Sequence, residues 1–217
     1  MSDVAPETAH HAEKALKTLY DEFDGIHDRD TISRVMSDSL DRLSDATLED
    51  FVPTLAHRLA RERLKALGRA AGKIPRDRPE ILFVGLEGRG RSQMAAGLAN
   101  LRSDGKVFAH PVGTHARIEL DSNVVAVMDE LGVDLHESYP VPLTEDVLAA
   151  ADVVVTLGRS VGDVYVPDGV RHEDWRIGDP VGAPLNEVRH IRDELDVRVQ
   201  ELLIDIVPAP VDPFADE

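Results

Sequence analysis

One stretch constrains the fold of this chain more than any other: an apolar strand runs into a glycine-rich turn, which opens a helix. It covers residues 80–98, which read EILFVGLEGRGRSQMAAGL. In such a turn several backbone N–H groups converge at the N-terminus of a helix, whose dipole also favours negative charge. Arg91 adds a planar, bidentate clamp for an anion. The stretch therefore predicts a cradle for an oxyanion at the end of a buried strand.

Strands and helices alternate after this turn, which predicts an α/β fold. Apolar strands separated by helices indicate a parallel four-stranded sheet with helices on both faces and right-handed crossovers. Ligands of such sheets bind at the carboxyl ends of the strands, where the 85–92 turn lies. The expected strands are 81–84, 106–109, a short piece near Leu135, and 153–157; the expected helices are 91–103, 121–131, 144–150 and 185–206.

The N-terminal third has a helical period, and it predicts a small three-helix bundle in front of the α/β domain. Apolar residues recur at Leu16, Leu19, Tyr20, Phe23, Ile32, Val35, Met36, Leu40, Leu43, Leu55, Leu59, Leu64 and Leu67. We expect a helical domain over 1–72, a proline-containing linker over 73–79, an α/β domain over 80–207 and an acidic, proline-rich tail over 208–217. The tail is expected to be disordered or loosely laid on the surface. The bundle is either an independent packing module or a site for homodimerisation or partner docking.

Composition narrows the class of protein. Among 217 residues, 41 are acidic and 24 are Lys or Arg, so the net charge is −17. This charge argues against a nucleic-acid surface and against docking to an anionic membrane, because both need clustered cations. Without a targeting stretch or a long apolar run, we expect a cytoplasmic protein. The chain contains no cysteine, which excludes disulfides, thiolate metal sites and a thiol relay.

The turn is similar to the signature loop of the low-molecular-weight protein tyrosine phosphatases and the thiol-linked arsenate reductases of the same fold. That loop is written cysteine, five residues, arginine, serine, and it aligns here on Arg91 and Ser92. Further matches follow in the family's order: Gly113-Thr114 and the segments 123–132, 142–144, 152–156 and 175–180. The N-terminal helices resemble a domain that some actinobacterial arsenate-reductase-like proteins carry.

The resemblance implies a role for each matching residue. Arg91 corresponds to the arginine that holds the anion, Ser92 to the serine that stabilises the thiolate, and Asp179 of Asp179-Pro180 to the general acid. The nucleophilic cysteine corresponds to Gly85, and the asparagine found inside the loop of many members corresponds to Gly88. A nucleophile needs a lone pair close to the electrophile, and glycine supplies none.

We therefore predict a non-catalytic relative of this family that binds phosphate, arsenate or a phosphorylated partner. Losing a like charge next to a dianion favours binding of the anion. An alternative is an active arsenate reductase or phosphomonoesterase with a cysteine-free mechanism, and a second is a structural partner protein with an empty loop. The predicted anion-binding residues are Gly85, Leu86, Glu87, Gly88, Arg89, Gly90, Arg91 and Ser92, with Asp179 at the general-acid position and without a turnover role.

Other polar residues near the turn have competing interpretations. Arg89 and Arg159 either extend a local positive patch or pair with Glu87 and Asp163. His110 and His115 follow the second strand, but two histidines without a nearby carboxylate pair are a poor ligand set for a metal. We expect no metal and no cofactor. Trp175 is expected to pack in the core at a strand edge.

Overall fold

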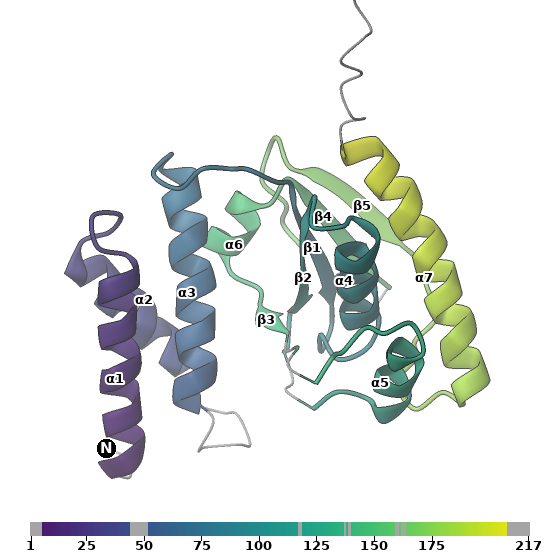
Figure 1. The fold of residues 1–217 in the computed structure, drawn as a ribbon, viewed down its shortest axis with the longest axis horizontal. Coiled ribbons are helices and arrows are strands. Elements are labelled where there is room, and N and C mark those ends of the chain that lie inside the picture. Colours follow the sequence, from purple (N-terminus) through teal and green to yellow (C-terminus); the bar gives the residue numbers. More distant parts are fainter. Residues whose placement is uncertain are drawn as a thin grey trace, which may run out of the picture. The chain divides into compact units, whose positions relative to one another are not determined.

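The structure is a computed structural model that describes residues 6–43, 52–116, 119–136, 138, 140–158, 161 and 164–207. The chain divides into two compact units (Figure 1). The first unit comprises Met1–Arg76 together with Thr144–Ala150, and the second comprises Asp77–Leu143 together with Ala151–Glu217. The chain therefore leaves the second unit once, for seven residues, before it returns.

The first unit contains the three predicted N-terminal helices, α1 (Pro6–Glu22), α2 (Arg29–Arg42) and α3 (Val52–Ala70). Asp28 is the N-cap of α2, where its Oδ1 accepts a 2.7 Å hydrogen bond from the Thr31 amide. Pro53 lies in the first turn of α3, where the missing N–H costs nothing. The helices share one apolar core: Leu19, Phe23, Ile32, Val35, Met36, Ala56, Ala60 and Leu64.

A short fourth helix, α6 (Glu145–Ala150), joins these helices. Arg63 of α3 is buried, and its guanidinium contacts Asp38 of α2 at 2.6 Å and Asp146 of α6 at 2.7 Å. The sequence placed residues 144–150 in the α/β domain, whereas the structure groups them with the bundle. The Arg63 ion pairs are one physical reason for this difference, because they tie α6 to the bundle helices.

The second unit is built on a parallel sheet, which confirms the predicted fold class. Its strands are β1 (Glu80–Gly85), β2 (Phe108–Gly113), β3 (Val141–Pro142), β4 (Val153–Leu157) and β5 (Arg171–Trp175). Their order is β3-β2-β1-β4-β5, and each neighbouring pair is parallel. The strand β1, which leads into the glycine-rich turn, therefore lies at the centre of the sheet.

The sheet has five strands, so the prediction of four was wrong. The fifth strand, β5, reads RHEDW and is largely exposed, so it lacks the apolar pattern that identifies a buried strand. The extended piece expected near Leu135 is not a strand; β3 comes a few residues later and consists of only Val141 and Pro142. The second strand begins at Phe108 rather than at residue 106.

The helices α4 (Arg91–Arg102), α5 (Ser122–Asp129) and α7 (Leu185–Ile206) share one apolar core with the sheet. Ile81 and Phe83 of β1 belong to this core, while Leu82 and Val84 on the other face of the strand are buried as well. Successive side chains of a strand point to opposite faces of the sheet, so burial of both sets shows that both faces of the sheet are covered. Trp175 is buried against Phe83, with ring centroids 5.7 Å apart, as its position predicted.

None of the described helices has the length and apolar character that a membrane span requires. The acidic tail from residue 208 onward, to which the sequence assigned disorder, lies outside the described residues.

Candidate functional site

A cavity of about 410 Å³ lies where β1 ends and α4 begins. All eight residues of the predicted turn line it, together with Asp179 and Val181. Residues almost ninety positions apart in the sequence are therefore brought together at the carboxyl edge of the central strand. This is the edge at which parallel sheets present ligand sites.

Backbone hydrogen bonds attach the first part of the turn to the loop after β2. The Thr114 amide donates to the Gly85 carbonyl at 3.1 Å, and the His115 amide donates to the Leu86 carbonyl at 2.7 Å. Gly85 and Gly113 are register partners at the ends of their strands. His115, considered as a metal ligand from the sequence, contributes to the site through its main chain.

Gly88 is the position in the turn where only glycine fits. Its φ is +73°, and a Cβ added there would lie 2.2 Å from the Cβ of Pro140. An L-residue would therefore combine a left-handed backbone with a steric clash. The asparagine that the resemblance implied at this position has no room here.

We expect Gly88→Ala to destabilise the chain by more than the ~1–2 kcal/mol of a left-handed alanine alone, because Pro140 must also move. Gly132→Ala is the matched control, since Gly132 has the same φ of +73° but no atom within 4 Å of an added Cβ. Urea unfolding of both variants measures the difference. An equal loss of stability in both would show that Pro140 does not constrain the turn.

Arg91, the predicted anion clamp, is buried and fixed at the rim of the cavity. Its Nη1 donates to the Ile177 carbonyl at 3.0 Å, and its Nη2 donates to Asp179 Oδ2 at 3.1 Å. Gly158, with φ +84°, makes room for the guanidinium, because a Cβ there would lie 2.1 Å from Nη1. Sequence reasoning missed Ile177 and Gly158. The signal that marks this edge is a glycine directly after β4, comparable with Gly85 at the end of β1 and Gly113 at the end of β2.

Asp179 lies in the cavity wall and also shapes the turn before α7. Its Oδ1 accepts a 3.1 Å hydrogen bond from the Val181 amide, and its side chain is 58% exposed. Arg89 pairs with Glu87 at 2.5 Å, so of the two interpretations given to it, pairing with Glu87 is the one observed. Arg159 and Asp163 lie outside the described residues.

The hydroxyl of Ser92 lies next to the position that a side chain at residue 85 would occupy. Ser92 is 1% exposed, and its Oγ has no hydrogen-bond partner among the described residues. A Cβ added at Gly85 would lie 3.3 Å from this Oγ and 3.8 Å from the Gly88 amide nitrogen. A buried hydroxyl without a partner is costly, and such groups often mark a site for water or ligand.

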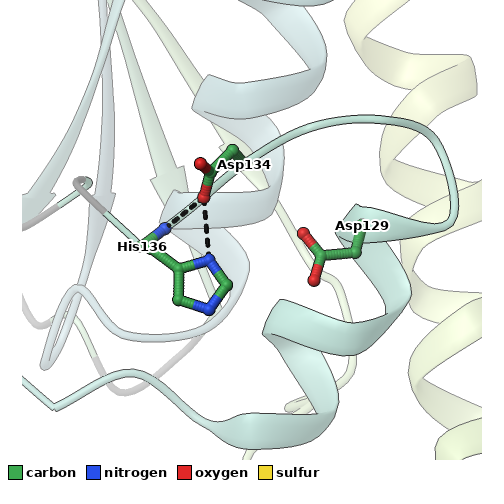
Figure 2. Close-up of side chains that lie close together, drawn as sticks. All are labelled: Asp129, Asp134 and His136. Carbon is green, nitrogen blue, oxygen red and sulfur yellow. Dashed lines mark hydrogen bonds and ion pairs between the residues drawn. The ribbon is translucent and has the colours of Figure 1, made fainter.

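One group of side chains among the described residues has donors close enough together to hold a metal ion. Asp129, Asp134 and His136 place their donor atoms within 4.8 Å of one another, and all three are exposed (Figure 2). His136 Nδ1 lies 2.8 Å from Asp134 Oδ1. The hydrogen bond and charge of Asp134 raise the pKa of His136, with a smaller contribution from the charge of Asp129.

We expect Asp134→Asn to lower the pKa of His136, and Asp129→Asn to lower it less. The protonated imidazole is the form that Asp134 favours. Its stabilisation is therefore complete below the pKa of His136 in the unfolded chain and is lost as the pH rises through the higher pKa of the folded chain. Titration of the His136 ring protons by NMR measures both shifts. A larger drop in the pKa of His136 in Asp129→Asn than in Asp134→Asn would contradict Asp134 as the main cause of the raised pKa.

Comparison with known proteins agrees with this architecture. A family model described as low molecular weight phosphotyrosine protein phosphatase matches residues 80–210, and one described as protein-tyrosine-phosphatase-like, N-terminal domain, matches residues 13–68. A putative arsenate reductase of Halobacterium salinarum is 34% identical over 131 residues, which are 58% of this chain and 92% of that protein.

Two solved structures are also similar. A thioredoxin-dependent arsenate reductase of Corynebacterium glutamicum superposes with a TM-score of 0.80 at 30% identity, covering 91% of this chain and 96% of that one. An arsenate reductase in the phosphate binding state has a TM-score of 0.54 at 30% identity, covering 59% of this chain and 98% of that one. The phosphatase family model spans more than half of the residues of this chain. The chain therefore belongs to the low molecular weight phosphotyrosine protein phosphatase family.

Proposed function

We propose that this chain is a non-catalytic member of its family that binds a phosphate-like oxyanion in the 85–92 loop. The observation that carries the proposal is Gly85, which the resemblance aligns with the nucleophilic cysteine and which lines the same cavity as Arg91 and Ser92. Covalent catalysis requires an atom with a lone pair about 3 Å from the electrophile. Gly85 presents only Cα–H there, and the chain has no cysteine elsewhere to replace the missing thiol.

The N-terminus of α4 supports the anion-binding part of the proposal. Its N-cap is Gly90, which makes no side-chain capping bond, and Arg91, Ser92 and Gln93 of the first turn are buried. The first amides of a helix have no partner inside the helix, so a buried, uncapped N-terminus needs another acceptor. An oxyanion in the cavity satisfies these amides and is also favoured by the helix dipole and by Arg91.

The missing thiolate strengthens this argument. In an active relative a thiolate and a dianion share one cavity, and two like charges about 4 Å apart repel by roughly 4 kcal/mol at an effective dielectric constant of 20. Glycine at residue 85 removes this repulsion and leaves space next to Ser92 Oγ. A water or an oxygen of the anion in that space would give the buried hydroxyl a partner.

A cysteine-free enzyme is the competing interpretation, and it needs a water activated by a base. Asp179 is the carboxylate at the general-acid position, but both of its oxygens accept hydrogen bonds, from Arg91 and from the Val181 amide. These bonds fix the carboxylate in the cavity wall, so a water has to reach it from one of the acceptor directions that remain open. A homodimer through the N-terminal helices is a separate prediction. Analytical ultracentrifugation of the whole chain, which measures its mass in solution, tests it.

Calorimetric titration of phosphate and arsenate into the native chain tests the proposal, together with an assay of phosphomonoester hydrolysis. We expect binding without turnover, and a loss of about 10- to 100-fold in affinity in Arg91→Ala, because charge-assisted hydrogen bonds contribute about 1.5–3 kcal/mol. Arg102→Ala is the control, since Arg102 lies at the other end of α4 and pairs with Asp196.

Two results would count against the proposal. Hydrolysis by the native chain well above a buffer blank would show that it is an enzyme. Failure of the native chain to bind either anion would favour a structural or partner-binding role with an empty loop.

A further inference from the structure

The charged side chains that line the cavity form two pairs of opposite sign. Arg91 Nη2 lies 3.1 Å from Asp179 Oδ2, and Arg89 pairs with Glu87. Two arginines and two carboxylates give a formal charge of zero over the described residues that line the cavity. A ligand here therefore meets strong hydrogen-bond acceptors as well as donors.

The carboxylate of Asp179 is held in the cavity wall and is still accessible. Oδ1 accepts from the Val181 amide and Oδ2 accepts from Arg91, while the side chain is 58% exposed. An ionised carboxyl group offers about four acceptor sites and no donor. It can therefore accept one more hydrogen bond, from a ligand that carries an O–H group.

Arg91 stays available to the same ligand. A guanidinium has five N–H donors, and the described residues take two of them, at Ile177 and at Asp179. Its position does not depend on Asp179 alone, because the Ile177 carbonyl holds Nη1 from another direction. The cavity thus presents cationic donors and one fixed anionic acceptor side by side.

We propose that Asp179 selects protonated oxyanions, hydrogen phosphate or hydrogen arsenate, against sulfate. The inference rests on the proposed function, which is that the loop binds an oxyanion. Phosphate and arsenate carry at least one proton near neutral pH, so one O–H donates to Asp179 while the other oxygens accept from Arg91 and the loop amides. Sulfate carries no proton, so one of its oxygens would face the carboxylate as a second acceptor with the same sign of charge.

A site that is built to accept a hydrogen bond discriminates against a ligand that lacks the donor, because its acceptor is left unpaired. The discrimination reaches ~10⁴ or more in fully enclosed sites. Asp179 is more than half exposed, so water partly compensates, and we expect the native chain to favour phosphate over sulfate by about 10- to 100-fold.

The experiment is calorimetric titration of phosphate, arsenate and sulfate into the native chain, Asp179→Asn and Glu87→Gln at pH 7. An asparagine keeps the acceptor for the Val181 amide, replaces the acceptor of Arg91 Nη2 by an N–H donor and removes the negative charge, while the Ile177 carbonyl still accepts from Arg91 Nη1. Sulfate affinity should therefore rise until the two anions bind within about threefold of each other. Glu87→Gln removes one charge from the same cavity without touching the selecting group. It should raise the affinity for both anions alike and leave the ratio of the two affinities unchanged.

The outcomes separate this inference from the proposed function. If phosphate and sulfate bind the native chain equally, or if Asp179→Asn keeps the selectivity, the inference is wrong while oxyanion binding stands. If neither phosphate nor arsenate binds the native chain, the proposed function fails and the inference fails with it. Circular dichroism of each variant confirms that the chain is folded.

Discussion

The Gly85→Cys variant is expected to hydrolyse p-nitrophenyl phosphate, and the native chain is expected to leave this substrate intact. A thiol at residue 85 would lie next to Ser92, in the cavity that Arg91 and the loop amides already surround. We expect a rate at least ~10² above that of the native chain. The gain should stay below the ~10⁶ that removing a nucleophile costs an evolved enzyme, because the surrounding residues are adapted to glycine.

The backbone at residue 85 accepts this change. Gly85 ends a strand and is not among the glycines with positive φ, so a side chain there causes no backbone strain. The added Cβ would lie 3.3 Å from Ser92 Oγ, a close contact that a small movement of the hydroxyl relieves. Gly85→Ala is the control: it fills the same space without a nucleophile and should show no turnover. Equal rates in the alanine and cysteine variants would exclude covalent catalysis by the thiol.

The largest effect on stability is expected from Arg63→Ala in the helical unit. The Arg63 side chain is 11% exposed and pairs with Asp38 and Asp146, and Asp146 is equally buried. Removing one partner of a buried ion pair costs about 3–5 kcal/mol, because the remaining charge has no compensation. Asp38 is 44% exposed and can be hydrated, so we expect a loss near the lower end of this range.

Arg61→Ala is the matched control, because Arg61 lies on the same helix and pairs with Glu22 at 2.7 Å, where the two side chains are 41% and 31% exposed. Exposed ion pairs contribute less than about 1 kcal/mol to stability, so the free energy of unfolding of this variant should be close to that of the native chain. The measurement is unfolding in urea, monitored by far-UV circular dichroism. Because urea is uncharged, it does not raise the ionic strength that would screen the ion pairs. Similar losses in the two variants would show that burial does not distinguish them.

The sequence predicted that the turn and Asp179 would lie together, and they line one cavity, while binding of an anion there stays a prediction. The turn from Gly85 to Ser92 is one continuous stretch, and the Asp179-Pro180 pair is recognisable by its resemblance. What the sequence did not show are contacts made by main-chain atoms and by residues of other segments. The Ile177 carbonyl accepts from Arg91 whatever the side chain of residue 177 is, and the close approach of Gly158 to the guanidinium depends on how the end of β4 lies beside the start of α4.

The errors in the fold have a common physical origin. Periodicity detects an element by the side chains that it buries, and β5 buries little besides Trp175. The strand β3 contains only two residues, too few for any period, and its position depends on pairing of Val141 with Val112 of β2. Likewise, the sequence of residues 144–150 does not indicate that Asp146 accepts a hydrogen bond from Arg63, which is 83 positions earlier.

The grouping of α6 with the N-terminal helices has a consequence for how this protein can be divided. The two matched family models suggest modules that are separable between residues 68 and 80, yet the chain passes between its two compact units three times, at residues 76–77, 143–144 and 150–151. A fragment cut at the linker would carry α6 away from Arg63 and leave Asp146 without its cation. The boundary between the two matched family models therefore does not coincide with the boundary between the two compact units, and a cut at the linker separates residues that belong to one compact unit.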